Sequence, residues 1–231
     1  MIRGLAILAA GGSKRAGEDK VLADLGGHPV LAWSLAAASA AGVFDRIVVV
    51  GGPDRLARLA AVAREWLPSA TVVAGGATRT ASSWSALDAL AGADIVAIHD
   101  AARPFAPPSL FARLVEAAEK NGSAVAGLPL AETVRRADEA GVARDEIERD
   151  GLWAAQTPQV FRRELLVRAR EAAGDRTFTD DAAAVAASGT QVRMVLGERR
   201  NLKLTTLEDL AYARELVRSG VAAIAAAAAR T

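Results

Sequence analysis

Apolar runs of strand length alternate along most of the chain with segments of helical periodicity. The apolar runs are continuous, which is typical of strands buried on both faces of a mostly parallel sheet. We predict strands at residues 5–9, 46–50, 70–74, 94–98, 123–128 and 191–196. We predict helices at residues 30–41, 54–66, 79–90, 109–121, 164–173 and 206–218. This alternation predicts an α/β fold with one doubly wound, mostly parallel sheet.

The segment from residue 131 to 159 departs from this alternation. Residues 133–137 have the pattern of an extended strand, and residues 138–141 that of a turn. We predict a single domain over residues 1–231 from which this segment projects as a β-arm. Exposed apolar side chains on a projecting arm usually require a partner, so we expect a homodimer that forms through the arm. A hairpin folded onto its own domain is the alternative.

The composition excludes several kinds of site and partner. The chain has no cysteine, so disulfides, thiolate metal sites and cysteine nucleophiles are ruled out. Two histidines, His28 and His99, leave little room for a zinc site. The formal net charge of +1 argues against nucleic-acid binding through overall charge but allows a local basic pocket. No segment has the roughly 18 apolar residues of a membrane span, so we predict a cytoplasmic protein without a membrane partner.

Four loops at the ends of predicted strands carry the candidate chemistry. Ligands of doubly wound sheets bind at the carboxyl ends of the strands, which is where these loops would meet. Glycines in such loops free backbone amides for phosphate oxygens, and Mg²⁺ prefers carboxylate and phosphate oxygens. Together, the glycines, one acid and several cations predict a site for a nucleoside triphosphate with a metal. The loops are residues 8–15, 75–83, 98–104 and 201–205.

Each loop also has a simpler interpretation when it is taken alone. A glycine-rich loop can be only a turn, and Asp100 can be a helix cap or a turn residue. For His99 we favour a histidine at the edge of the core that is hydrogen-bonded to the backbone. Arg103 could fix its loop by pairing with an acid, and a lone Lys203 is more often a solvated surface charge.

Six motifs in a fixed order resemble those of the 2-C-methyl-D-erythritol 4-phosphate cytidylyltransferase family. The strings at 99–104 and 157–159 are the specific ones, whereas the alanine-glycine loop occurs in many nucleotidyltransferases. The motifs are Ala9-Ala10-Gly11 with Arg15 and Lys20, Gly75-Gly76 with Arg79 and Ser82, His99-Asp100-Ala101-Ala102-Arg103-Pro104, and the strings at 151–159, 178–182 and 201–205.

The resemblance implies a Rossmann-like nucleotidyltransferase fold and transfer of a cytidylyl group from CTP to 2-C-methyl-D-erythritol 4-phosphate in isoprenoid precursor biosynthesis. It implies Mg²⁺ or another divalent cation, held by Asp100, and an arm that reaches the neighbouring subunit's site. Asp180 is expected to cap a helix. The implied catalytic residues are Arg15, Lys20 and Lys203; the CTP-binding residues are Ala9, Ala10, Gly11, Gly76, Ser82, Asp100 and Ala101; and the polyol-phosphate-binding residues are Thr133, Arg149 and Thr157.

Some residues depart from the family pattern, and other functions stay open. Ser13 stands at a usual glycine, Ala16 at a usual methionine, and Asp19 at a usual proline before Lys20. A ribitol 5-phosphate cytidylyltransferase would share the CTP site and differ in the polyol phosphate. A non-catalytic nucleotide-binding protein and an NAD(P)-dependent oxidoreductase are more distant alternatives. The oxidoreductase lacks support because the dinucleotide fingerprint is missing and Tyr212, the only tyrosine, has no lysine four residues later.

Overall fold

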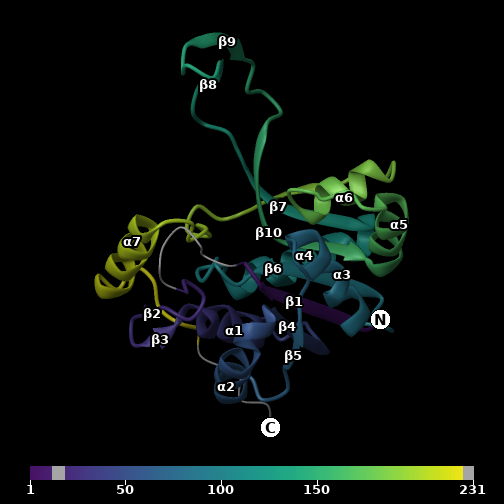
Figure 1. Ribbon diagram of the computed structural model, residues 1–231, viewed down its shortest axis with the longest axis vertical. Coiled ribbons are helices and arrows are strands. Elements are labelled where there is room, and N and C mark those ends of the chain that lie inside the picture. The colour runs from purple at the N-terminus through teal and green to yellow at the C-terminus, as the bar shows by residue number, and fades with distance from the viewer. Residues whose placement is uncertain (12–18, 226–231) are drawn as a thin grey trace.

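A seven-stranded sheet forms the centre of the protein in the computed structural model, which describes residues 1–11 and 19–225 (Figure 1). All neighbouring strands are parallel except β10, which is antiparallel to both of its neighbours. The predicted α/β fold with a mostly parallel sheet is therefore confirmed. The order across the sheet is β11 (Met194–Leu196), β7 (Ser123–Pro129), β10 (Trp153–Arg162), β6 (Ile95–Asp100), β1 (Arg3–Ala9), β4 (Arg46–Gly51) and β5 (Thr71–Ala74).

Side chains of the central strands alternate between two hydrophobic cores, one on each face of the sheet. In β1, Leu5 and Ile7 belong to one core, whereas Ala6 and Leu8 belong to the other. This double burial is the reason that the strands have continuous apolar runs. The first core is covered by α1 (Val30–Ala41), α2 (Leu56–Trp66) and α4 (Pro108–Asn121), and the second by α3 (Arg79–Ala89), α5 (Arg163–Ala173) and α6 (Asp181–Ala187).

A third, smaller cluster attaches α7 (Leu207–Arg218) to the body. Leu210 of this helix packs with Trp33 of α1 and with Leu25, which lies in the short hairpin of β2 (Asp24–Leu25) and β3 (His28–Pro29). Thr206 and Asp209 form a capping box at the start of α7, which satisfies its first backbone amides. The segment that precedes α7 is thereby held close to the sheet.

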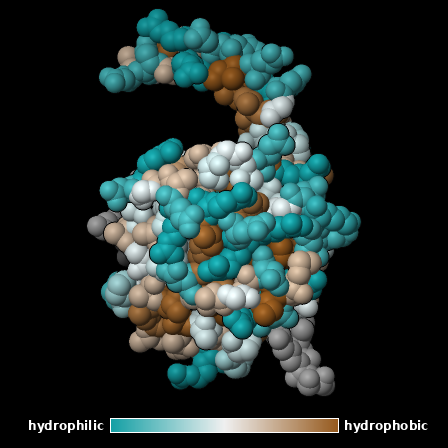
Figure 2. All heavy atoms as spheres, turned by 90° about the vertical axis from the view of Figure 1, so that its right-hand side faces the viewer, coloured by the Kyte–Doolittle hydropathy of each residue, from teal (hydrophilic) through white to brown (hydrophobic). Residues whose placement is uncertain are grey.

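The predicted β-arm is present and stands clear of the body (Figures 1 and 2). Its strands β8 (Val134–Ala137) and β9 (Ala143–Ile147) pair only with each other. The returning leg of the arm enters the sheet as β10, between β6 and β7. The expected arm of residues 131–159 therefore extends too far, because residues 156–159 are buried in the sheet. Their polar sequence, Gln-Thr-Pro-Gln, lacks the apolar run that would have indicated a strand.

Among the residues that the structure describes, no helix is both long and apolar enough to cross a membrane. The prediction of a single domain over the whole chain stays a prediction.

The 3-10 turn η1 (Pro53–Arg55) precedes α2 and accounts for the first residues of the helix that was expected from residue 54.

Candidate active site

The loops predicted to carry chemistry meet at the carboxyl ends of β1, β5 and β6. The amide of Ala101 donates to the carbonyl of Leu8 at 3.0 Å, which joins the loops after β6 and β1. A Cβ added to Gly75 would lie 3.1 Å from the Cβ of Ala10 and 2.7 Å from the Oγ of Ser82. This position therefore suits only glycine, and its close approach places the loops after β1 and β5 side by side.

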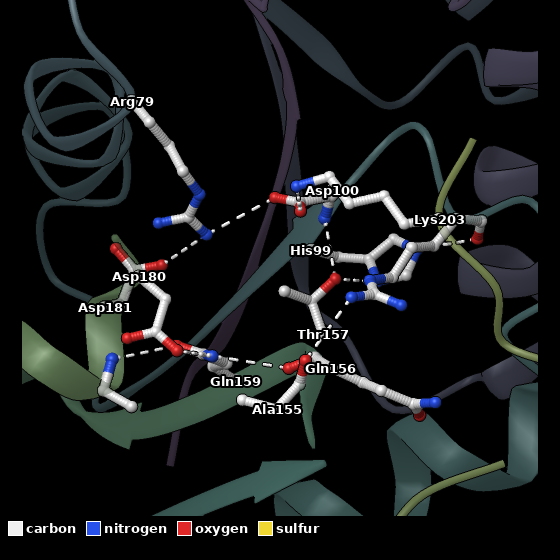
Figure 3. Close-up of polar contacts among 12 residues, drawn as sticks. Arg79, His99, Asp100, Ala155, Gln156, Thr157, Gln159, Asp180, Asp181 and Lys203 are labelled. Atoms are coloured by element: carbon white, nitrogen blue, oxygen red, sulfur yellow. Dashed lines mark hydrogen bonds and ion pairs between the residues drawn. The ribbon is translucent and has the colours of Figure 1, made fainter. Parts of the chain in front are cut away.

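Asp100 is the anionic centre of this site (Figure 3). It is the last residue of β6 and is 8% exposed. Its Oδ2 lies 2.7 Å from the Nζ of Lys203, and its Oδ1 lies 3.4 Å from Nη2 of Arg79. Burial alone raises the pKa of Asp100, but the charges of Arg79 and Lys203 outweigh burial and hold the pKa at about 2. The carboxylate is therefore ionised at neutral pH.

Arg79 contributes to the site, although sequence reasoning assigned it no role. Its Nη2 lies 2.8 Å from Oδ2 of Asp181, so the guanidinium points between two carboxylates (Figure 3). Burial lowers the pKa of Arg79, but the charges of Asp181 and Asp100 outweigh burial and raise it. The available signal was its place at the start of α3, directly after the Gly75-Gly76 turn.

The neighbouring Asp180 caps α6, as expected. Its Oδ1 accepts a hydrogen bond from the amide of Ala183 at 2.8 Å, and its Oδ2 accepts from Nε2 of Gln159 at 2.8 Å. The cap fixes the start of α6 and with it the position of Asp181. The predicted helix ranges did not include α6, because seven residues rich in alanine have no clear periodicity.

His99 is a buried, neutral histidine with defined proton positions. Burial lowers its pKa to about 4. Its Nε2 lies 3.3 Å from the carbonyl oxygen of Arg103, so this nitrogen carries the proton. Its Nδ1, 3.1 Å from Oγ1 of Thr157, then accepts a hydrogen bond from that hydroxyl, which itself accepts from the amide of Asp100 at 3.0 Å. The expected histidine bonded to the backbone is confirmed.

We expect His99 to make the stability of the protein fall as the pH falls from 6.5 to 4. In that interval the unfolded state binds a proton at this side chain and the native state does not, so unfolding is favoured by up to about 3 kcal/mol at pH 4. The contribution is absent above pH 6.5. Urea unfolding at pH 7.5 and 4.5 measures it, with His28→Gln as a control. Equal pH dependence in wild type and His99→Gln would contradict the assignment.

These contacts hold the Thr157 side chain against the backbone of Asp100 and the ring of His99, away from solvent. Its side chain has two hydrogen-bond partners, and the residue is 3% exposed. In this structure Thr157 therefore orients Asp100 and His99. Its contact with a polyol phosphate stays a prediction.

The two lysines predicted to be catalytic are brought together by their loops. The Nζ of Lys20 donates a hydrogen bond to the carbonyl of Thr205, in the segment that carries Lys203. The side chain of Lys203 is 42% exposed and ion-paired with Asp100, so it is not a freely solvated charge. Arg15, the third predicted catalytic residue, lies outside the described residues.

A buried arginine that sequence reasoning missed holds both ends of the loop after β1. Arg55 donates to the carbonyl of Ala10 at 2.9 Å and to Oδ1 of Asp19 at 3.0 Å. It is 9% exposed. The pairing of Asp19 with Arg55 fixes the backbone directly before Lys20.

The residues predicted to bind CTP line the same edge of the sheet. Ala9 and Ala101 are buried, Ala10 is half-buried, and Gly11 and Gly76 are exposed. Ser82 is buried, and its hydroxyl donates to the carbonyl of Thr78 at 2.9 Å. The structure thus brings these positions together, and their contacts with CTP stay predictions.

Thr133 and Arg149, the two predicted site residues on the arm, are exposed. Arg149 donates to the carbonyl of Ala131 within the arm. In the described part of the chain, no hydrogen bond or ion pair joins Thr133 or Arg149 to Asp100. The arm leaves the body after β7, which is parallel to β6, so it rises from the edge of the sheet that carries Asp100 (Figure 1).

A divalent cation fits this site only if a ligand supplies most of its oxygen atoms. Within residues 1–11 and 19–225 there is no group of three or more acidic, histidine or cysteine side chains that could hold a metal ion. Asp100 offers one ionised carboxylate. Mg²⁺ is commonly bound by one or two carboxylates together with substrate phosphates and water. The residues therefore fit Mg²⁺ bound together with a triphosphate.

Comparison with known sequences identifies close relatives. Residues 4–219 match the family model described as 2-C-methyl-D-erythritol 4-phosphate cytidylyltransferase. A protein of that name from Geobacillus kaustophilus (strain HTA426) is 38% identical over 222 residues, which are 94% of this chain and 97% of the relative. A bifunctional enzyme IspD/IspF from Anaeromyxobacter sp. (strain Fw109-5) is 45% identical over 223 residues, 94% of this chain and 58% of that enzyme. The chain thus spans little more than half the length of the bifunctional relative.

Two solved structures are also similar to this chain. The 2-C-methyl-D-erythritol 4-phosphate cytidylyltransferase of Thermus thermophilus is 33% identical with a TM-score of 0.78, and the match covers 94% of this chain and all of that one. The 4-diphosphocytidyl-2C-methyl-D-erythritol synthase of Anaerococcus prevotii is 27% identical with a TM-score of 0.83, over 94% of this chain and 98% of that one.

Proposed function

The chain belongs to the 2-C-methyl-D-erythritol 4-phosphate cytidylyltransferase family, and we propose that it converts CTP and 2-C-methyl-D-erythritol 4-phosphate to 4-diphosphocytidyl-2-C-methyl-D-erythritol and pyrophosphate. The observation that carries the proposal is that Lys203 contacts the ionised Asp100 at the carboxyl edge of the sheet, while Lys20 contacts the segment that carries Lys203. This is the edge at which doubly wound folds bind their ligands.

In the proposed reaction an oxygen of the polyol phosphate attacks the α-phosphorus of CTP in line. The new P–O bond forms as the bond between the α-phosphorus and the oxygen that bridges it to the β-phosphorus breaks, and pyrophosphate leaves with that bridging oxygen. Negative charge spreads over the phosphoryl oxygens in the transition state, so cations positioned there accelerate the reaction. We assign this role to Lys20 and Lys203, and to Arg15 as well. Bound at Asp100, Mg²⁺ or another divalent cation would neutralise triphosphate charge.

The cytosine ring would lie against the loops after β1 and β5. Small residues there leave room for the ring to approach the backbone: Ala9, Ala10, Gly11, Gly76, Ser82 and Ala101. Backbone amides and carbonyls at a close approach distinguish bases by the pattern of donors and acceptors. We therefore assign these residues to CTP binding.

The arm supports a second part of the proposal, that the enzyme is a homodimer. Hydrophobic side chains on and beside the arm are exposed, including Val142 at 51%, Leu152 at 37% and Trp153 at 36%. Figure 2 shows that hydrophobic residues gather where the arm joins the body. A second subunit would cover them, and its site would receive Thr133 and Arg149. The cytoplasmic location stays a prediction.

Arg149→Ala is expected to raise the KM for the polyol phosphate at least tenfold and to change the KM for CTP less than threefold. A guanidinium that binds a phosphate contributes a charge-assisted hydrogen bond, the stronger kind in proteins. Steady-state kinetics with each substrate varied in turn measures both constants. The matched control is Arg144→Ala, since Arg144 lies on the same arm in an exposed ion pair with Asp138. An equal rise in both constants would argue against the assignment of Arg149.

A pyrophosphate-release assay distinguishes the remaining functions. Turnover of 2-C-methyl-D-erythritol 4-phosphate with CTP supports the proposal, and turnover of ribitol 5-phosphate alone would contradict it. If neither polyol phosphate is turned over, isothermal titration measures whether the protein binds CTP or NADPH. CTP binding without product would indicate a non-catalytic nucleotide-binding protein, and NADPH binding without CTP binding would indicate an oxidoreductase.

A further inference from the structure

The segment that carries Lys203 has no regular secondary structure of its own. Residues 197–206 connect β11 with α7, and none of them belongs to a helix or strand. The Gly197 amide donates to the carbonyl of Gly127 at 2.7 Å, and the Leu204 amide donates to that of Ala102 at 2.8 Å. Between these two anchors the described backbone–backbone hydrogen bonds stay within the segment, from Asn201 to Glu198 and from Leu202 to Arg200, so side-chain hydrogen bonds join it to the body.

Asn201 and Gln156 provide those hydrogen bonds. Asn201 is completely buried, and its Nδ2 donates to Oε1 of Gln156 at 3.1 Å and to the carbonyl of Thr157 at 2.8 Å. Gln156 is 8% exposed. Its Nε2 donates to the carbonyl of Glu198 at 2.9 Å, and its Oε1 accepts from the amide of Glu198 at 3.2 Å. We call these two side chains the Gln156–Asn201 clasp.

Arg103 closes the same arrangement from the loop after β6. Its Nη1 donates to the carbonyl of Asn201 at 2.7 Å, and its Nη2 donates to that of Ala155 at 3.5 Å. The expected pairing of Arg103 with an acid is therefore replaced by hydrogen bonds to two carbonyls, and no ion pair of Arg103 occurs among the described residues. Strand β10, the loop after β6 and the segment of residues 197–206, which lie far apart in the sequence, are joined at this point.

We propose that the Gln156–Asn201 clasp positions Lys203 for phosphoryl transfer. Lys203 follows Asn201 by two residues, and Thr157, which follows Gln156, bonds the backbone of Asp100. The clasp thus sets the lysine backbone relative to the carboxylate that its ammonium contacts at 2.7 Å. Asn201 and Gln156 are positioning residues, because neither reaches the open side of the site. This inference rests on the proposed cytidylyl transfer.

Loss of the clasp would leave the loop held by its backbone anchors at Gly197 and Leu204 and by Arg103, without the side-chain hydrogen bonds that place Asn201. The Lys203 side chain is already 42% exposed, so a displaced backbone would leave the ammonium in water at little cost. Displacement of a reacting or charge-stabilising group by about 1 Å can lower a rate about a hundredfold. We therefore expect Asn201→Ala to lower kcat between about tenfold and a hundredfold, with a change of less than threefold in the KM for the polyol phosphate.

A double-mutant cycle tests the proposal, with kcat and thermal unfolding measured for Asn201→Ala, Lys203→Ala and the double variant. If Asn201 acts through Lys203, the double variant has the kcat of Lys203→Ala alone. Effects that multiply would overturn the proposal, as would an Asn201→Ala enzyme that retains more than half of its kcat. Ser123→Ala is the control, since it removes a buried hydroxyl that bridges residues 191 and 193, away from Lys203. It should lower thermal stability and leave kcat within twofold.

Two further measurements keep the test decisive. If Asn201→Ala does not fold, Gln156→Ala takes its place in the same cycle with the same expectations. A wild-type enzyme that releases no pyrophosphate contradicts the proposed function but not yet the clasp. The cycle is then measured on the dissociation constant for CTP with Mg²⁺, where coupling between Asn201 and Lys203 supports the clasp and its absence overturns it.

Discussion

Lys203→Ala is expected to lower turnover by about 10²- to 10³-fold while the protein stays folded. A preorganised group that stabilises developing charge in a transition state contributes this much in enzymes where such groups have been removed. The Lys203 ammonium lies 2.7 Å from the carboxylate of Asp100, at the point where we place the triphosphate. Its flexible stem lets the ammonium turn from that carboxylate to a phosphoryl oxygen. Pyrophosphate release under saturating substrates measures the effect.

The chain offers a matched control for this substitution. Lys120 lies on α4 in an exposed pair with Glu116, and no role in the site is assigned to it. Lys120→Ala should keep turnover within twofold, because exposed pairs of this kind contribute little to stability. Lys20→Ala should resemble Lys203→Ala, since its ammonium reaches the same segment. Near-normal turnover in both variants would remove these lysines from the catalytic residues.

Asp100→Asn is expected to lower turnover at low Mg²⁺ by about 10²- to 10³-fold and to raise the half-saturating Mg²⁺ concentration. The substitution keeps the shape of the side chain and removes the charge that a hard cation requires. The rate measured as a function of Mg²⁺ at constant CTP tests this. Asp88→Asn is the control, because Asp88 forms an exposed pair with Arg170 on the surface. Unchanged Mg²⁺ dependence would exclude Asp100 as a metal ligand.

The same substitution has a second expected effect, on stability. The pKa of Asp100 lies at about 2 in the folded protein and at 3.8 in its ordinary state. The folded state therefore gains stability that is fully present above pH 4 and is lost as the pH falls through about 2. The difference corresponds to about 2 kcal/mol at pH 7. Urea unfolding of Asp100→Asn at pH 7 should show a loss of this order, provided that Arg79 keeps Asp181 as its partner.

The parallel strands were predictable because each of them faces two apolar cores. Strands β1 and β4 begin and end within two residues of the predicted bounds. Strand β10 could not be predicted in this way, since its residues 156–159 are polar and yet buried. Gln159, for example, is satisfied by Asp180 and by the amide of Ala182. Such partners lie far away in the sequence, so the hydropathy pattern around β10 does not indicate them.

The same limit applies to the site. Asp100 was found as a carboxylate at the end of a predicted strand, at the edge where ligands bind, whereas the catalytic role of Lys203 came from the family resemblance. Arg79 received no role because its role depends on ion pairs with Asp100 and with Asp181, which lies about a hundred residues further along the chain. Arg103 was expected to pair with an acid, but its guanidinium donates to two backbone carbonyls. Residue type and position locate the site, whereas the partners of each charge follow only from the tertiary structure.

The position of β10 between β6 and β7 has a consequence for synthesis of the chain on the ribosome. Strands β1, β4, β5 and β6 can assemble once residue 100 has emerged, but β7 has no direct contact with this group in the sheet. Until residues 153–162 are made, the apolar strand β6 has an open edge. Open edges of this kind pair with other chains, and incomplete α/β domains aggregate through them. The risk of misassembly therefore lasts from the completion of β6 until β10 inserts beside it.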